Sequence, residues 1–275
     1  RESMRLVDRW HGAEDGRLRY AFAPRFVLSC SERLLKQVGE ASIDRGIRIH
    51  THASENPTEC EMVQAKTGLR NIDYFDRIGI LGPHTTLAHC VWLSKGEERL
   101  LQTRQTSIAH CPSSNFKLAS GVAPIPDFLE RGITVGLGAD GAPCNNNLDI
   151  FTEMRLAGLI HKPRFGATSM PAAQVLEMAT LNGARALGLE DEVGALVPGM
   201  RADMVVVDLT GPHVAPVGDD ILSTIVFAAQ GRDVRDVGID GRCLYRNRQF
   251  VEVDAQKIIR NAERAAKRLR RACEV

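Results

Sequence analysis

The chain has 275 residues, of which 44% are hydrophobic and 25% charged, a composition ordinary for a folded globular protein. Its formal net charge of +1 argues against electrostatic binding of nucleic acid or an anionic membrane, and no apolar run is long enough to span a bilayer. Seven cysteines without a CxxC pair indicate a reducing compartment rather than a disulfide framework, so we expect a cytoplasmic protein.

The first predicted elements are a helical segment with turns in residues 1–18, a strand at 19–23 and a longer helix. Ser29-Cys-Ser-Glu32 is a capping-box pattern, which predicts that the longer helix begins there, and it closes near Gly46. Its expected apolar stripe consists of Leu34, Leu35, Val38 and Ile43.

The strand at 47–52 delivers a histidine to its carboxyl end. Read with period two, it places Arg48, His50 and His52 on one face. Asn56-Pro57-Thr58-Glu59 then predicts a helix to about residue 67, with Asn56 as N-cap and Glu59 reaching back to the cap. Functional groups of parallel α/β folds sit at such strand-to-helix junctions, so His52 and nearby Glu55 are candidate site residues.

Three further strands, at 85–90, 106–112 and 133–139, carry His89, His110 and Asp140 at or near their ends. Five strands that alternate with helices predict a parallel sheet, since parallel neighbours need crossover connections. Small residues on the last strand, Gly136 and Gly138, are expected to leave room for the side chains of facing strands. No strand is followed by GxGxxG or GxxxxGK, which argues against dinucleotide or nucleotide triphosphate binding.

Helices are predicted at 148–161 and 171–187, and after residue 189 short runs with PG and DG turns predict antiparallel strands outside a barrel. The segment 255–273 is a basic amphipathic helix, which we interpret as a solvated helix packed on the domain rather than as a site for an anionic partner. We therefore divide the chain into a partial barrel (1–190), a small composite β domain (191–250) and a C-terminal helix (251–275).

Three strand ends present His52, His89 and Asp140, with Glu55 beside the first. Imidazole nitrogens and a carboxylate are the ligand set of Zn²⁺ or a similar divalent metal such as Fe²⁺, and three protein ligands leave a position for water. Because a bound metal lowers the pKa of water from ~15.7 to about 7, hydrolysis is the chemistry that this set indicates.

With these motifs the sequence resembles the amidohydrolase superfamily, and within it the aminohydrolases that include guanine deaminase, the S-adenosylhomocysteine, 5′-methylthioadenosine and 5′-deoxyadenosine deaminases, and the triazine hydrolases. The resemblance covers nearly the whole chain. It rests on the order and spacing of Pro24-Arg-Phe26, His52-Ala-Ser-Glu55, Ala88-His-Cys90, His110-Cys-Pro-Ser-Ser-Asn115, Gly138-Ala-Asp-Gly141, Val193-Gly-x-x-x-Pro-Gly199 and Arg201-Ala-Asp203.

The resemblance implies an α/β fold, a (β/α)8 TIM-like barrel of which strands four to eight are present. The C-terminal part of a small β-sandwich domain and a C-terminal helix complete the expected architecture. In such a barrel the fifth strand supplies the metal ligand His52. The eighth supplies Asp140, which also takes the proton from the attacking water.

The resemblance also implies roles for the remaining site residues. His89, on the sixth strand, orients the water and is a candidate third metal ligand, while Glu55 hands a proton to the substrate ring nitrogen. A carboxylate beside a cation stays ionised and can accept a proton, whereas one against a substrate ring can cycle as an acid. Arg25 resembles the residue with which guanine deaminases hold the purine carbonyl. His50, His84 and His110 match no ligand position and are interpreted as interior residues or residues behind the ligands.

One departure from the family is clear: the His-x-His pair of the first barrel strand is absent, and only His50-Thr51-His52 has that spelling, on the fifth strand. We expect either an N-terminally truncated sequence or a chain completed by a partner or by self-association, and thus a homo-oligomer.

Three functions stay open. The first is a metal-dependent aminohydrolase that acts on an aminated purine-like ring, of adenosine type or guanine. The second is a hydrolase of another leaving group, such as a triazine chloride, an amide or an ester. The third is a non-catalytic remnant. The expected partner for the enzymes is a small heteroaromatic molecule, with no nucleic acid and no membrane.

Overall fold

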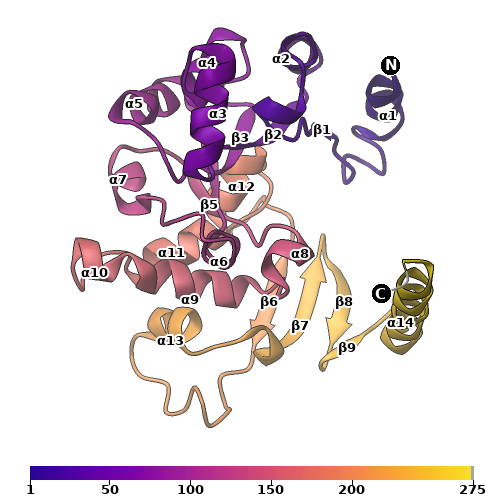
Figure 1. Ribbon diagram of the computed structural model, residues 1–275. Helices are drawn as coiled ribbons and strands as arrows, with labels where there is room; N and C mark the ends of the chain where they lie inside the picture. The colour runs from indigo at the N-terminus through magenta and orange to yellow at the C-terminus, as the bar shows by residue number, and fades with distance from the viewer. Residues whose placement is uncertain (274–275) are drawn as a thin grey trace.

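The computed structural model describes residues 1–273, whose strands form a parallel and an antiparallel sheet (Figure 1). The parallel sheet has the order β1-β2-β3-β4-β5, which is also the chain order. Its strands are β1 (Ala21–Phe22), β2 (Arg48–Ala53), β3 (Thr85–His89), β4 (Ser107–His110) and β5 (Val135–Leu137). The antiparallel sheet consists of β6 (Met204–Val207), β7 (Val234–Ile239), β8 (Arg242–Arg246) and β9 (Gln249–Phe250).

Helices connect the strands of the parallel sheet (Figure 1). Those up to β5 are α1 (Glu2–Trp10), η1 (Val27–Ser29), α2 (Glu32–Arg45), α3 (Pro57–Thr67), α4 (Asn71–Arg77), α5 (Lys95–Arg104), α6 (Pro112–Lys117) and α7 (Ile125–Glu130). After β5 come α8 (Ala142–Asn145), α9 (Ile150–Ile160), α10 (Lys162–Phe165), α11 (Ala172–Ala179), α12 (Leu181–Leu187), α13 (Ile221–Phe227), η2 (Gly231–Asp233) and α14 (Ala255–Ala272). The prediction of an α/β fold with a parallel sheet is confirmed.

The start of α3 agrees with the prediction in part. Asn56 is the N-cap, and its side chain accepts a hydrogen bond from the backbone N of Glu59 at 2.9 Å. Glu59 does not reach back to the cap itself. Its carboxylate instead accepts from the backbone N of Ser54 at 3.2 Å and of Glu55 at 2.7 Å. The buried carboxylate thereby holds the loop that carries Glu55.

The predicted start and apolar stripe of α2 are wrong in detail. Ser31, rather than Ser29, caps the helix by accepting from the backbone N of Leu34. The buried face includes Leu35 and Gly39, whereas Ile43 is 68% exposed. The reason is close packing. A Cβ at Gly39 would lie 2.7 Å from the carbonyl oxygen of Gly79, so the face of the helix that carries Gly39 is the one that packs against the core.

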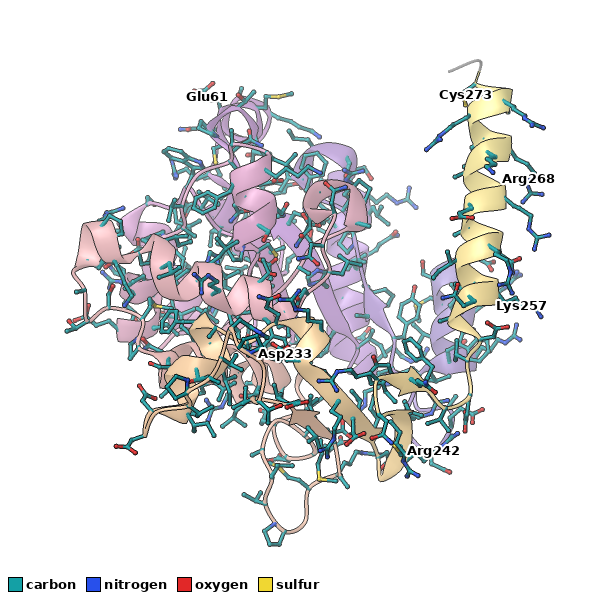
Figure 2. The ribbon with its side chains drawn as sticks, turned by 90° about the horizontal axis from the view of Figure 1, so that it is seen from below. Glu61, Asp233, Arg242, Lys257, Arg268 and Cys273 are labelled. Atoms are coloured by element: carbon teal, nitrogen blue, oxygen red, sulfur yellow. The ribbon has the colours of Figure 1, made fainter. Side chains whose placement is uncertain are left out.

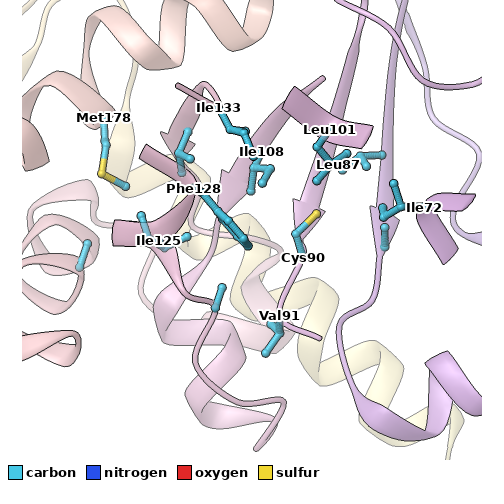
Figure 3. Packing of buried hydrophobic residues seen from close by; sticks show 14 of the residues in the cluster. Ile72, Leu87, Cys90, Val91, Leu101, Ile108, Ile125, Phe128, Ile133 and Met178 are labelled. Atoms are coloured by element: carbon cyan, nitrogen blue, oxygen red, sulfur yellow. The ribbon is translucent and has the colours of Figure 1, made fainter. Parts of the chain in front are cut away.

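The core lies between the parallel sheet and the helices that follow its strands. Leu87, Ile108 and Val135 occupy facing positions on β3, β4 and β5 and are fully buried. Figure 3 shows Leu87 and Ile108 in one layer with the buried helix residues Leu101 and Phe128. Each such side chain contributes about 1.5–3 kcal/mol through the hydrophobic effect, so this layer fixes the positions of the strand ends.

Small residues form a row on the opposite face of the sheet, at Ala88, Ala109 and Gly136. We expected the room left there to serve side chains of facing strands. It accommodates the backbone of α12 instead, because a Cβ at Gly136 would lie 3.1 Å from the Cα of Gly183. The helix also accepts a hydrogen bond at the carbonyl of Ala186 from the hydroxyl of Thr86.

The predicted helix at 171–187 is two helices, α11 and α12, separated by Thr180. Thr180 has φ −123° and ψ −96°, outside the helical region, and its hydroxyl donates to the carbonyl of Leu176 at 2.7 Å. A β-branched residue that bonds its own preceding turn weakens helix continuity. The break lets α12 turn across the sheet while α11 packs against α9 and α13.

The basic helix α14 extends away from the rest of the molecule (Figure 2). It contains no buried residue, and Ile258, Ile259 and Leu269 are all exposed. The prediction that it packs on the domain is therefore wrong: three large apolar side chains on an otherwise charged or small surface bury too little area to hold it there. The last two residues of the predicted C-terminal helix lie outside the described residues. Within residues 1–273, no helix is both long enough and apolar enough to cross a membrane.

Candidate active site

Polar residues gather at the carboxyl edge of the parallel sheet. His52 lies near the end of β2, His89 is the last residue of β3, and Asp140 follows β5. The rings of His52 and His89 stack with centroids 5.3 Å apart, and Nε2 of His89 lies 3.8 Å from Oε2 of Glu55. Parallel strands end at the same edge, so residues from three connections meet there.

At two of these strand ends the backbone φ angle lies in the left-handed region. His89 has φ 72° and Asp140 has φ 60°. Along β3, strict alternation would place His89 on the face of Leu87, inside the helix-covered core. The positive φ at His89 ends the alternation and lets its ring reach that of His52. A non-glycine residue in this conformation costs about 1–3 kcal/mol, and such strain clusters at functional sites.

Each imidazole of the pair is oriented by a carbonyl oxygen. Nδ1 of His52 lies 2.7 Å from the backbone oxygen of Arg25, and Nδ1 of His89 lies 2.8 Å from Oδ1 of Asn115. A carbonyl oxygen only accepts, so each Nδ1 carries the proton and donates it. The Nε2 atoms of both rings make no hydrogen bond within residues 1–273, and Nε2 is the atom through which histidines oriented in this way bind metals.

The carboxylate of Asp140 is held ionised. Oδ2 accepts from the hydroxyl of Ser114 at 2.6 Å, and Oδ1 accepts from the backbone N of Gly141 at 2.6 Å. Partial burial raises the pKa of Asp140, but these two hydrogen bonds and the nearby His89 and His52 outweigh it, so the pKa lies below its usual value.

Glu55 is half-buried beside this pair of histidines. Its Oε1 accepts from the hydroxyl of Ser120 at 3.1 Å, and its Oε2 faces His89. The carboxylate therefore has one oxygen fixed by a buried hydroxyl and the other directed at the imidazole.

The other histidines differ in position. His110 is fully buried and His84 is half-buried, as interior residues are. His50 is exposed and is therefore not an interior residue. Its ring centroid lies 6.3 Å from that of His52, and its alternative role, behind the ligands, stays a prediction. Partial withdrawal of its ring from water lowers the pKa of His50, repulsion from His52 and His89 adds to this, and Asp140 opposes it.

Arg25 enters the site through its backbone rather than its side chain. The guanidinium is exposed and makes no hydrogen bond or ion pair within residues 1–273. Its carbonyl oxygen, in contrast, accepts hydrogen bonds from the hydroxyl of Thr51 and from Nδ1 of His52.

The sequence analysis did not predict a role for Ser114, Asn115 or Ser120, although the first two lie in the motif that begins at His110.

The donor set at this edge fits a borderline divalent cation. Two imidazoles whose Nε2 atoms make no hydrogen bond within residues 1–273, together with a carboxylate, are the kind of side chains that Zn²⁺ selects. In the part of the chain that the structure describes, no three His, Cys, Asp or Glu side chains are already arranged to hold a metal ion. The chemistry of the residues suits the metal, and their arrangement brings the histidines and Glu55 together.

A parallel sheet with imidazoles and carboxylates at its carboxyl edge defines the chain as an α/β protein with a site of the kind that hydrolases use. Residues 1–244 match the sequence profile of the amidohydrolase family, and the chain belongs to that family. The resemblance inferred from the motifs is confirmed at this level.

Named relatives are similar over almost the whole chain. A 5′-deoxyadenosine deaminase from Methanosarcina acetivorans is 43% identical over 270 residues, which are 98% of this chain and 62% of the relative. A 5-methylthioadenosine/S-adenosylhomocysteine deaminase from Pelotomaculum thermopropionicum is 42% identical, with the same coverage of 98% and 62%. The chain thus spans less than two thirds of the length of these curated relatives.

Solved structures share the fold. An adenosine deaminase from Xanthomonas campestris with bound zinc superposes with a TM-score of 0.94 at 32% identity, covering 98% of this chain and 61% of that one. An atrazine chlorohydrolase from Arthrobacter aurescens complexed with zinc gives a TM-score of 0.89 at 28% identity, covering 94% and 58%.

Proposed function

We propose that the whole protein is a metal-dependent aminohydrolase that removes the exocyclic amine of an adenosine-type purine nucleoside. The similar deaminases from Methanosarcina and Pelotomaculum support this substrate class. The observation that carries the proposal is the stacked pair His52 and His89, with both Nδ1 protons held by carbonyl oxygens, beside the carboxylate of Glu55.

The proposed metal is zinc, supported by the zinc-containing neighbours and by the donor set. His52 and Asp140 would hold it, with His89 as a further candidate ligand. When bound, such a metal makes water acidic enough to ionise near neutral pH. A position left open by three protein ligands is what catalytic zinc sites keep for water.

The protein residues supply the proton transfers. Asp140, kept ionised by Ser114 and Gly141, accepts a proton from the attacking water. Glu55 delivers a proton to the ring nitrogen next to the carbon that is attacked, which neutralises the charge that the attack creates. His89 contacts the water through its free Nε2 and orients it. Arg25 is proposed to contact the purine substituent, and its exposed guanidinium is free to do so.

We propose further that β1 to β5 correspond to strands four to eight of a (β/α)8 barrel. Their parallel order along the sheet and the site at their carboxyl edge support this. The four antiparallel strands β6 to β9 would belong to a small β-sandwich domain, with 1–190, 191–250 and 251–275 as the units of the chain. Homo-oligomer formation and a cytoplasmic location stay predictions, and light scattering measures the first.

Ammonia release tests the function. The whole protein, loaded with zinc, is incubated with 5′-deoxyadenosine, 5′-methylthioadenosine, S-adenosylhomocysteine, guanine and a chlorotriazine, and with simple esters and amides. We expect ammonia and an inosine-type product from the adenosine-type substrates. A zinc-loaded protein that ignores every aminated ring but hydrolyses the triazine, esters or amides would refute the deaminase proposal in favour of another hydrolase.

A further inference from the structure

We propose that the segment 112–120, the connection after β4, is the positioning element of the site, and that Ser114, Asn115 and Ser120 are its positioning residues. Each holds one residue of the set that the proposed function requires, so this inference rests on that function. The pairs are Ser114 with Asp140, Asn115 with His89, and Ser120 with Glu55.

The three partners belong to three different connections of the sheet. Asp140 follows β5, His89 ends β3, and Glu55 follows β2, while the segment itself follows β4. The distances are 2.6 Å from Ser114 Oγ to Asp140 Oδ2, 2.8 Å between His89 Nδ1 and Asn115 Oδ1, and 3.1 Å from Ser120 Oγ to Glu55 Oε1. One short segment therefore sets the relative positions of all three side chains.

Burial makes these hydrogen bonds strong and specific. Ser114, Asn115 and Ser120 are 0%, 1% and 2% exposed. Water has little access to these three side chains, and a hydrogen bond is electrostatically stronger in the low dielectric of the interior. The two serine hydroxyls and the amide oxygen of Asn115 thus hold their partner side chains in one orientation, whereas a fully solvated side chain would adopt several.

The segment is itself held rigidly. The backbone N of Ser120 donates to the carbonyl of Asn115 at 2.8 Å, which closes the turn after α6. The buried carboxylate of Glu153 accepts from the backbone N of Ser113 at 3.1 Å and from Nδ2 of Asn145 at 2.8 Å. Glu153 thereby joins this segment to the connection after β5, which carries Asp140.

The amide of Asn115 is oriented for His89 at a cost to stability. Its Nδ2 is buried and has no hydrogen-bond partner in residues 1–273. A buried donor left unpaired is unfavourable, so a residue present for stability alone would be expected to satisfy both ends of its amide. Pointing Oδ1 at His89 forces Nδ1 to carry the proton, which leaves Nε2 as the acceptor that the proposed site needs.

The first test reads the His89 tautomer by long-range ¹H–¹⁵N NMR of the zinc-free protein at pH 8, assigned by the signal that is lost in His89→Gln. We expect the Nδ1–H tautomer in the wild type and in Asn115→Asp, which keeps an acceptor oxygen. In Asn115→Leu the Nε2–H tautomer should gain population. A tautomer that is unchanged in Asn115→Leu would overturn the assignment. If that variant fails to fold, an Nε2–H tautomer in Asn115→Asp would overturn it, and the wild-type tautomer would support it.

The second test compares Ser114→Ala with Ser113→Ala, a matched control whose side chain contacts no site residue through a hydrogen bond. Zinc affinity, measured by chelator competition, should fall about 10–100-fold in Ser114→Ala and stay within about twofold in Ser113→Ala. Equal zinc affinity in the two variants would refute a positioning role for Ser114.

The third test uses turnover. Ser120→Ala should lower kcat about 10–100-fold while KM changes less than about threefold, because the orientation of Glu55 affects the reaction step rather than binding. A rise in KM with an unchanged kcat would contradict this. If no adenosine-type substrate is converted by the wild type, the proposed function fails, and the tautomer and zinc measurements still decide whether the segment positions His89 and Asp140.

Discussion

His110 and His161 face each other inside the core, with ring centroids 5.7 Å apart and all four ring nitrogens buried without a hydrogen-bond partner in the described part of the chain. Burial lowers the pKa of His110 to about 3, with repulsion from His161 and His89 adding to it. Burial also lowers the pKa of His161 to about 4, helped by Arg164. Both rings are therefore neutral at physiological pH.

This pair predicts acid sensitivity. Unfolded histidine binds a proton below its ordinary pKa of about 6.5, whereas these rings bind one only near pH 3–4, so stability is complete above about pH 6.5 and falls as the pH drops towards 4. His110→Phe should reduce the slope of unfolding free energy against pH by roughly 1.4 kcal/mol per unit between pH 4.5 and 5.5. Urea unfolding at several pH values measures this. An unchanged slope in His110→Phe would contradict the prediction.

Close packing of α2 predicts a large effect of one methyl group. In Gly39→Ala the new Cβ would lie 2.7 Å from the carbonyl oxygen of Gly79, so the helix must shift. This shift should lower the free energy of unfolding by about 1–3 kcal/mol. Gly96→Ala in α5 is the control: its Cβ would meet only Ser94 Oγ at 3.7 Å, and it should stabilise by up to about 1 kcal/mol. Chemical unfolding separates the two, and equal effects would show that α2 adapts freely.

The buried carboxylate of Glu59 predicts a link between stability and the position of Glu55. Glu59→Gln replaces a charged acceptor of two backbone N–H groups by a neutral one, and should cost about 1–3 kcal/mol. Because Glu55 is one of the two backbone donors, turnover should fall as well. Glu61→Gln, on the exposed side of the same helix, should leave both unfolding free energy and kcat unchanged. Wild-type stability in Glu59→Gln would refute the role of its charge.

The proposed chemistry predicts different losses at the two carboxylates. Glu55→Gln should lower kcat by about 10²–10⁴-fold and leave zinc bound, since this residue transfers a proton but does not hold the metal. Asp140→Asn should lose both turnover and zinc. Elemental analysis and steady-state kinetics on the same preparations give the comparison. Full zinc content in Asp140→Asn would remove that residue from the metal site.

The parallel sheet and its polar edge could be predicted from the sequence because their signals are local. Period-two alternation placed His52 on the open face of β2, and a strand followed by a capped helix located His52 and Glu55. The cap Asn56 is where its motif predicts it.

What the sequence could not predict depends on contacts between distant residues. Leu34 and Ile43 were expected in the buried stripe of α2. Because Gly39 packs closely against Gly79, the face with Leu35 and Gly39 is buried instead, and Leu34 and Ile43 are exposed. Ser120 reaches Glu55 across 65 positions, and nothing in its neighbours in sequence indicates that partner. The left-handed φ at His89 likewise has no local signal, since a positive φ is uncommon in residues other than glycine.

Connections between strands and helices normally accept insertions, because they run over the surface. The connection after β4 is an exception in this fold. Ser114 and Ser120 are separated by five residues and must reach the ends of different strands at the same time, so one added or deleted residue would break at least one of the two contacts. The length of this stretch, and not only its composition, is therefore under constraint, and libraries that diversify the rim of the site should leave the residue count of 112–120 fixed.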